Sequence, residues 1–215
     1  MYRVVRAVAD FLLGLITRRE YIGLDNIPVE PPYIIVTNHL AVFDSPLVLT
    51  VCPHTARAFA AAKHKGNPFY ALLLTIMGSI WVRRGEVDRK ALQEALRVLE
   101  RGEVLGMAPE GTRARGPYAL QRGKIGVAYI ATRSDVPIVP LGITGSENIK
   151  HSLPHLRRAD VRIVVGKPFR LPENGRVRSQ KLHEYTDLIM CRIAELLPEK
   201  YRGVYGDVEC SGAGG

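Results

Sequence analysis

A chain of 215 residues in which 47% are hydrophobic is long enough to bury a full core, so a single globular domain is expected. Its 30 lysines and arginines outnumber 21 acidic residues and give a formal charge of +9, which favours an anionic partner such as a phospholipid surface or a phosphorylated metabolite. No helix-turn-helix, zinc-finger or RNA-binding signature accompanies this charge, so no nucleic-acid partner is expected.

The cysteines argue against a metal site. Cys52, Cys191 and Cys210 are widely spaced and include no C-x-x-C pair, and the histidines and carboxylates form no dense ligand cluster. We therefore expect no metal and no other bound cofactor. The odd number of cysteines also indicates no disulfide framework, which is typical of a protein in a reducing cytoplasm.

The first segment, residues 1–19, has the pattern of a basic amphipathic helix. Apolar residues recur at helical spacing between Arg3 and Arg19. The apolar run is interrupted by Asp10, is shorter than the ~20 residues that a spanning helix needs and precedes no small-residue cleavage site. We therefore expect neither a transmembrane segment nor a signal peptide.

Two roles fit such a helix. In the headgroup region of a membrane it would turn its basic residues toward anionic lipid, whereas on its own domain it would pack its apolar face against the core. We assign residues 1–22 to a membrane-interface helix on the cytoplasmic face of the cell membrane, peripheral or monotopic, and keep packing on the domain as the alternative.

From residue 23 onward, short apolar runs alternate with helical patterns. Strands are expected over 33–36, 56–61, 80–82, 104–108, 136–143 and 161–165. Helices are expected after a cap at Ser45, over 69–77, after a cap at Asp88, over 123–133 and after a cap at Ser179. This order predicts an α/β fold, a mostly parallel sheet flanked by helices, in one domain over 23–203 with a flexible tail over 204–215. Pro137 and Pro140 indicate an irregular strand or an edge strand.

The most informative stretch, residues 37–46, follows the first of these strands. Five positions separate two side chains on an ideal helix by about 140°, so His39 and Asp44 can meet only if the chain turns between them. A carboxylate on one imidazole nitrogen fixes the tautomer and stabilises the imidazolium, which suits general-base catalysis. Taken alone, the pair fits a helix cap and a packed histidine equally well.

Two further strands end in residues suited to binding phosphate. Arg83 and Arg84 follow the third strand, and Glu110-Gly111-Thr112-Arg113 follows the fourth. Guanidinium groups hold phosphate oxygens by forked hydrogen bonds, and a glycine turn lets the backbone approach a ligand. Because the carboxyl ends of parallel strands share one edge, an α/β sheet would bring these residues to the rim that carries His39. Taken singly, each arginine also fits a surface ion pair, and Glu110 fits a turn cap.

Four blocks occur in a fixed order along the chain. Residues 38–44 read NHLAVFD, residues 78–84 read GSIWVRR, residues 109–113 read PEGTR and residues 136–140 read VPIVP. In this order they resemble the glycerolipid acyltransferases of the 1-acylglycerol-3-phosphate acyltransferase type, in which the first block has the form N-H-x4-D. The resemblance extends over roughly residues 22–170.

The resemblance implies a role for each matching residue. It assigns catalytic roles to His39 as the base and Asp44 as its orienting partner, and substrate-binding roles to Arg84, Glu110, Gly111, Thr112 and Arg113, with the two arginines as phosphate contacts. Three positions depart from the family pattern, because Ala41, Arg83 and Ala108 stand where a serine, an acidic residue and an aromatic residue are usual. None of them removes a group that the chemistry needs, but they leave the acceptor lipid open.

The activity that the resemblance implies is acyl transfer in phospholipid biosynthesis. A fatty acyl group would pass from acyl-CoA or acyl-carrier protein to the sn-2 hydroxyl of 1-acylglycerol-3-phosphate, a lysophosphatidic acid, to give phosphatidic acid at an anionic membrane surface. Two alternatives remain. One is an acyltransferase of the same family for another lysolipid, and the other is a non-catalytic peripheral protein that binds anionic lipid.

Overall fold

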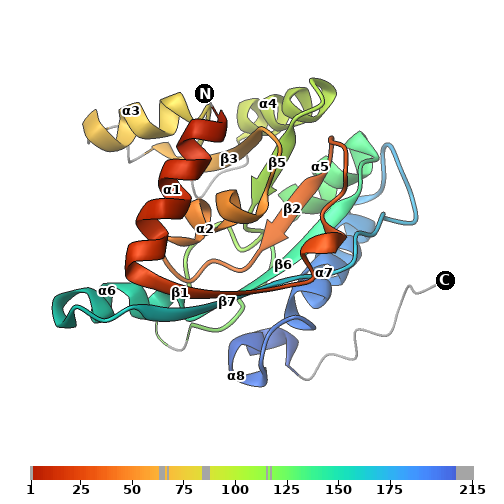
Figure 1. Cartoon of the computed structure of the whole chain (residues 1–215). Helices are drawn as coiled ribbons and strands as arrows, with labels where there is room; N and C mark the ends of the chain where they lie inside the picture. Colours follow the sequence, from red (N-terminus) through yellow and green to blue (C-terminus); the bar gives the residue numbers. More distant parts are fainter. Residues whose placement is uncertain are drawn as a thin grey trace.

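The computed structural model describes residues 2–62, 66, 68–83, 88–114, 116 and 118–206 (Figure 1). The strands are β1 (Thr17–Ile22), β2 (Ile34–Thr37), β3 (Ala56–Ala61), β4 (Ile80–Val82), β5 (Val104–Met107), β6 (Ile138–Thr144) and β7 (Ala159–Val165). The α-helices are α1 (Tyr2–Ile16), α2 (Asp44–Val51), α3 (Pro68–Ile76), α4 (Arg89–Glu100), α5 (Gly126–Ser134), α6 (Ile149–Ser152), α7 (Ser179–Ala194) and α8 (Glu199–Arg202). Short 3₁₀ turns are η1 (Leu24–Asn26), η3 (Ser146–Asn148), η4 (Leu153–His155) and η5 (Gly203–Tyr205).

The strands form one sheet in the order β1-β7-β6-β2-β5-β3-β4. Neighbouring strands are parallel except for β6 and β7, which are antiparallel. The predicted α/β fold with a mostly parallel sheet is therefore confirmed. Strand β2 lies between β6 and β5, so its carboxyl end, where His39 follows, is central on the rim of the sheet.

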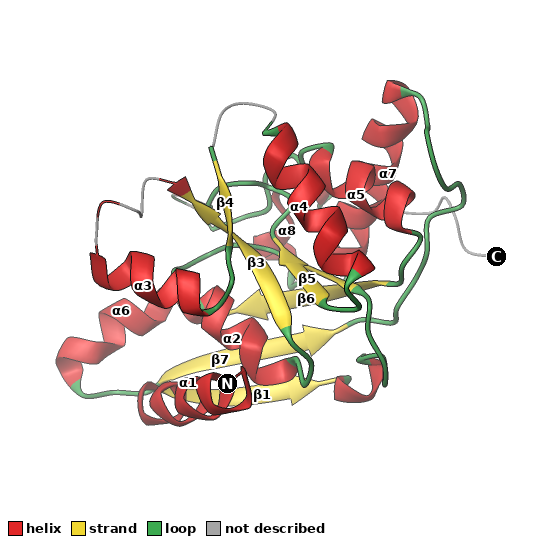
Figure 2. Ribbon diagram, turned by 90° about the horizontal axis from the view of Figure 1, so that it is seen from above, coloured by secondary structure: helices red, strands yellow, loops and turns green. Residues whose placement is uncertain are grey.

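Helices cover both faces of the sheet (Figure 2). The helices α1 and α2 pack on one face, and α4, α5 and α7 pack on the other. Side chains of β2 alternate between these two layers. Ile34 and Val36 pack with α4, α5 and α7, whereas Ile35 packs with α1 and α2. A strand buried on both faces needs apolar residues throughout, which is why β2 appears in the sequence as an unbroken hydrophobic run.

The N-terminal helix is shorter than predicted. It ends at Ile16, and residues 17–22 form the edge strand β1, which pairs in parallel with β7 from Thr17 to Ile22. Thr17 Oγ1 donates a hydrogen bond of 2.6 Å to the carbonyl oxygen of Leu13, one of the acceptors left free where the helix stops. The prediction that residues 17–22 continue the helix is therefore wrong, because these residues pair with β7, a strand more than a hundred positions later in the sequence. Within the described residues, no helix combines the length and the hydrophobicity that crossing a bilayer requires.

Of the two alternatives predicted from the prolines, the edge strand is wrong, since β6 lies between β2 and β7, whereas the irregular strand agrees with the pairing. The β7 ladder pairs residues 141–144 of β6 with residues 162–165, and one isolated bridge joins Ile138 to Phe169. Pro140 lies between these two pairings, and its carbonyl oxygen accepts from the amide of Gly166. The step from Ile138 to Leu141 faces the longer step from Val165 to Phe169, so the partner segment carries one extra residue here. A proline is tolerated at such a bulge, where the ladder of hydrogen bonds is interrupted.

Two predicted helix caps are misplaced by one residue or more. Helix α2 begins at Asp44 and α7 at Ser179, so Ser45 and Ser179 lie inside their helices and neither one caps it. The cap of α4 is confirmed, because the Asp88 side chain accepts a hydrogen bond from the amide of Ala91.

The start of the predicted flexible tail is ordered. Tyr205 is buried, its hydroxyl donates to Asp187 and it accepts from the amide of Gly123. Residues 207–215 lie outside the described part of the chain. Cys52 is a buried free thiol, whereas Cys191 is disulfide-bonded, so the expectation that the cysteines indicate no disulfide is wrong for Cys191.

Candidate active site

The side chain of Asn38 extends the sheet by one step beyond β2. Its Nδ2 donates to the carbonyl oxygen of Ile143 and its Oδ1 accepts from the amide of Ile143, both at 2.8 Å. The last backbone pair between these strands is Thr37 with Leu141, so the amide side chain imitates the next residue of a parallel strand. The backbone of β2 is thereby free to turn, and His39 leaves the sheet at its rim.

His39 and Asp44 meet across the turn that their spacing predicts. His39 Nδ1 lies 2.9 Å from Asp44 Oδ2, and the same oxygen accepts from the amides of Leu40 at 2.6 Å and Ala41 at 2.8 Å. Asp44 is 2% exposed, and its carboxylate is directed back into this loop, so it does not cap α2. The carboxylate can only accept, so Nδ1 carries the proton and Nε2 of the neutral ring is left as the basic nitrogen.

The free nitrogen of His39 faces away from these contacts. No described residue forms a hydrogen bond with Nε2, and the His39 side chain is 17% exposed. A base for an incoming hydroxyl needs this combination of a fixed ring and an open nitrogen.

Ser146 completes the surroundings of the carboxylate. Its hydroxyl donates to Asp44 Oδ1 at 2.5 Å, and the residue is fully buried. The preceding Gly145 has φ 84°, and a side chain there would collide with the carbonyl oxygen of Asp160, so this turn requires glycine. The sequence prediction missed Ser146 and Asn38 as site residues, because their partners lie about a hundred positions away in the chain.

Glu110 connects the loop after β2 with the loop after β5. Its Oε1 accepts from the amide of His39 at 3.1 Å and its Oε2 from the amide of Gln121 at 3.0 Å. The residue is 2% exposed. Burial raises the pKa of Glu110 above its usual range, although the amide hydrogen bonds from Gln121 and His39 oppose the shift. The amide of Ala114 also donates to the carbonyl oxygen of His39, so the loop after β5 holds the His39 backbone on both sides.

The turn after Glu110 presents unpaired donors. Gly111 has φ 67°, and the side chain of Lys124 lies so close over it that a Cβ would approach Lys124 Cδ to 3.0 Å. Among the described residues, neither the amides of Thr112 and Arg113 nor the Arg113 guanidinium finds an acceptor. Successive free amides after a left-handed residue, next to cationic side chains, form a concave surface suited to an anion.

The structure therefore brings most of the predicted site residues to one rim. His39, Asp44 and the run from Glu110 to Arg113 lie at the ends of the adjacent strands β2 and β5. Arg84 lies outside the described residues. Arg83 follows the edge strand β4, where its amide donates to Asp88. With strands about 4.8 Å apart, the end of β4 lies on the order of 10 Å from the end of β5.

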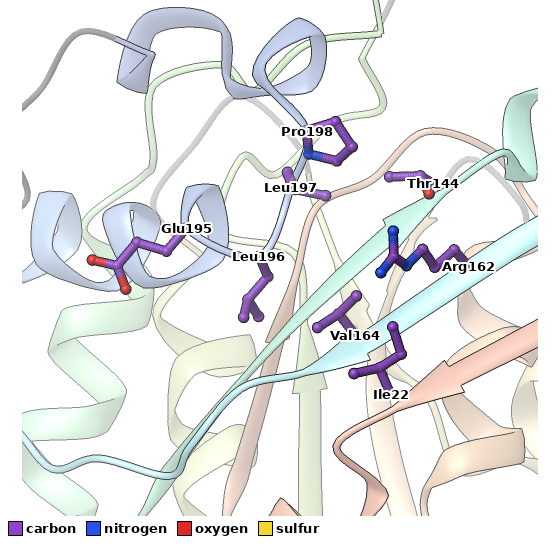
Figure 3. Close-up of a pocket in the computed structure, with 8 residues that line it drawn as sticks. All are labelled: Ile22, Thr144, Arg162, Val164, Glu195, Leu196, Leu197 and Pro198. Atoms are coloured by element: carbon purple, nitrogen blue, oxygen red, sulfur yellow. The ribbon is translucent and has the colours of Figure 1, made fainter.

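A separate hollow of about 340 Å³ opens on the sheet face that α7 covers (Figure 3). Ile22, Thr144 and Arg162 line it from the strands, and Leu196 lines it from the segment after α7. None of the site residues predicted from the sequence is among those that line it.

Comparison with known proteins identifies the family. The family model described as Acyltransferase matches residues 18–144, from β1 to the end of β6. The chain belongs to the acyltransferase family. The matched region contains the His39–Asp44 pair and the Glu110–Arg113 turn.

Relatives of this acyltransferase carry a more specific name. It is 34% identical to the 1-acyl-sn-glycerol-3-phosphate acyltransferase of Borreliella burgdorferi over 125 residues, which are 54% of this chain and 48% of that protein. The match thus spans about half the length of that relative. The protein of the same name from Bacillus subtilis is 21% identical over 198 residues, 91% of this chain and 96% of that protein.

The fold of the acyltransferase is also found in a crystal structure. The 1-acyl-sn-glycerophosphate acyltransferase of Thermotoga maritima superposes with a TM-score of 0.68 at 23% identity, over 86% of this chain and 75% of that one. At this identity the likeness shows a common fold.

Proposed function

We propose that this acyltransferase moves a fatty acyl group from acyl-CoA or acyl-carrier protein to the sn-2 hydroxyl of 1-acylglycerol-3-phosphate, giving phosphatidic acid. The observation that carries the proposal is the state of His39, whose Nδ1 is held by Asp44 while its Nε2 is open at the rim. Relatives named 1-acyl-sn-glycerol-3-phosphate acyltransferase support the choice of acceptor.

The proposed reaction uses one base twice. Nε2 of His39 takes the proton of the acceptor hydroxyl while that oxygen forms a bond to the thioester carbonyl carbon. When the tetrahedral intermediate collapses, the carbon–sulfur bond breaks and the departing sulfur takes the proton from Nε2. Asp44 holds the ring and stabilises its charged form between the two transfers. The substrate hydroxyl acts as the nucleophile, so no acyl-enzyme forms.

The acceptor phosphate is proposed to bind at the turn after β5. The Arg113 guanidinium and the free amides of Thr112 and Arg113 offer donors, and Gly111 leaves room for the side chain of Lys124, which adds a second cation beside the turn. Glu110 shapes this site from beneath by holding both loops. Arg84 is proposed as a second phosphate contact on the family pattern alone.

The helix α1 is proposed to lie in the membrane interface on the cytoplasmic side. Its two faces differ, because Arg6 Nη2 donates to the carbonyl oxygen of Thr50 on one side while a stripe of apolar side chains is exposed on the other. This stripe consists of Val4, Val8, Phe11, Leu12 and Leu15, each more than half exposed. The helix thus packs on its domain and also presents an apolar surface to lipid.

A panel of acceptors tests the proposal. Purified protein is mixed with one acyl-CoA and with lysophosphatidic acid, lysophosphatidylcholine, lysophosphatidylethanolamine or phosphatidylethanolamine, and released thiol is measured. The proposal expects the fastest release with lysophosphatidic acid. Faster release with another lipid would indicate a family member with a different acceptor, and no lipid-dependent release would indicate a lipid-binding protein without catalysis.

A further inference from the structure

Residues 149–158 project from the rim that carries the candidate active site; we call them the basic projection. After β6 the chain passes through Ser146, which bonds Asp44, and then runs through α6 and η4 before it returns to the sheet in β7. Ile149 at the root is fully buried. Figures 1 and 2 both show α6 standing out from the sheet on the side of the molecule where α3 lies.

The projection carries positive charge without any acidic residue. Its charged and titratable side chains are Lys150, His151, His155, Arg157 and Arg158, all exposed. No described residue forms an ion pair with the lysine or with either arginine. These cations are therefore available to an anionic surface.

Two leucines lie among these cations. Leu156 is 98% exposed and Leu153 is 40% exposed. Leu156 has φ 52°, a backbone conformation that a leucine rarely adopts, and its amide closes the turn onto the carbonyl oxygen of Leu153. Neither side chain contributes to the core, so folding alone gives no reason for leucine at the tip of a basic loop.

The projection adjoins the exposed stripe of α1. Arg158 Nε donates to the carbonyl oxygen of Leu15 at 3.3 Å. Leu12 and Leu15 of that stripe are more than half exposed. The projection and α1 are therefore neighbours, although they are far apart in the sequence.

We propose that the basic projection docks on an anionic bilayer, with Leu153 and Leu156 entering the headgroup boundary and the lysine and arginines contacting lipid phosphates. Mixed apolar and basic side chains on one exposed loop match the two components of such a surface. Because its root is continuous with Ser146, the docked projection holds the rim with His39 at the depth of lipid headgroups. The choice of lipid rests on the proposed function, but docking itself is measured without catalysis.

Vesicle flotation tests the docking. The full chain is incubated with vesicles of phosphatidylcholine mixed with phosphatidylglycerol and with vesicles of phosphatidylcholine alone. The double variant Leu153→Ser, Leu156→Ser should partition about tenfold less well onto the mixed vesicles. The double variant Lys150→Gln, Arg157→Gln should lose about twentyfold on the mixed vesicles only.

A matched control is available at the opposite rim of the sheet, where β2 and β3 begin. Val29 is 89% exposed, and its carbonyl oxygen accepts from His54 next to the amino end of β3. Val29→Ser should bind vesicles as the wild type does. If the leucine variant binds as well as Val29→Ser, the docking is overturned, and so it is if the lysine and arginine variant keeps its binding to the mixed vesicles.

Two further measurements separate this proposal from the others. Phe11→Ser tests the exposed stripe of α1. If this variant loses vesicle binding while the leucine variant keeps it, α1 binds the bilayer and docking by the projection is overturned. Acyl transfer to a monomeric short-chain lysophosphatidic acid should be equal in the wild type and the leucine variant. If the leucine variant loses transfer activity equally on monomers and on vesicles, the leucines act inside the domain and docking is overturned. If the wild type shows no transfer at all, the proposed function is contradicted, but the flotation result remains valid.

Discussion

Ser146 donates a hydrogen bond of 2.5 Å to Asp44 Oδ1, and both side chains are buried. The other carboxylate oxygen serves His39, so Ser146 fixes the carboxylate from the side opposite the imidazole. This links the end of β6 to the His39–Asp44 pair and makes Ser146 a positioning residue for the proposed base.

We predict that Ser146→Ala lowers kcat about tenfold with little change in KM, because a hydrogen bond to a charged group is lost and the carboxylate can move. In an Asp44→Asn background the same substitution should have almost no further effect on kcat. Ser134→Ala, which removes a hydroxyl bonded to the carbonyl oxygen of Ile130 in α5, is the matched control. An equal loss from Ser146→Ala in both backgrounds would show that Ser146 does not act through Asp44.

Asn38→Ala should destabilise the protein by about 2–4 kcal/mol, because the amide and carbonyl of Ile143 both lose a buried partner. Chemical denaturation measures the free energy of unfolding. Asn148 is exposed, so Asn148→Ala should change that free energy by less than about 0.5 kcal/mol. If the two variants are equally stable, the imitation of a strand by Asn38 is not a significant source of stability.

The raised pKa of Glu110 predicts a pH dependence of stability. The folded protein holds the Glu110 proton more tightly than the unfolded chain does, so folding gains stability as the pH falls through the raised pKa toward the ordinary glutamate value of about 4.3. The free energy of unfolding of the wild type should therefore rise relative to that of Glu110→Gln as the pH is lowered from neutral. Glu100→Gln, at an exposed position in α4, is the control. A difference between wild type and Glu110→Gln that stays constant or shrinks on acidification would contradict the burial argument.

Arg113→Ala should raise KM for lysophosphatidic acid by about 10- to 100-fold, because a charge-assisted hydrogen bond to phosphate is lost. Transfer to an acceptor without phosphate, such as a monoacylglycerol, should change little. Arg133→Ala is a suitable control, since Arg133 lies over the ring of Tyr129 at the end of α5. Equal losses on both acceptors would exclude a phosphate contact at Arg113.

Local patterns predict the strands of this fold well where burial is complete. The run 33–36, which forms most of β2, and the run that forms β5 are apolar because both sheet faces are covered, and the sequence alone locates both. Residues 17–22 are different, since Arg18, Arg19 and Glu20 continue a helical pattern and only the distant pairing with β7 makes them a strand. Tyr205 likewise follows the last predicted helix and is held by contacts with Gly123 and Asp187 that no local pattern encodes.

The candidate site, too, is only partly predictable from the sequence. The spacing of His39 and Asp44 requires a turn, and the order of the sequence blocks points to the loop from Glu110 to Arg113. The contacts that hold this geometry could not be predicted, because Asn38 and Ser146 act across about a hundred residues and Glu110 bonds backbone amides, which have no sequence signature.

The most direct test of the account is release of thiol from acyl-CoA that depends on lysophosphatidic acid, measured for the wild type and for His39→Ala. His183, exposed on α7, provides His183→Ala as the matched control. We predict that His39→Ala loses between about 10²- and 10⁴-fold in kcat, while its melting temperature and vesicle binding equal those of the control. Transfer by His39→Ala at the rate of His183→Ala would contradict the assignment of His39 as the base.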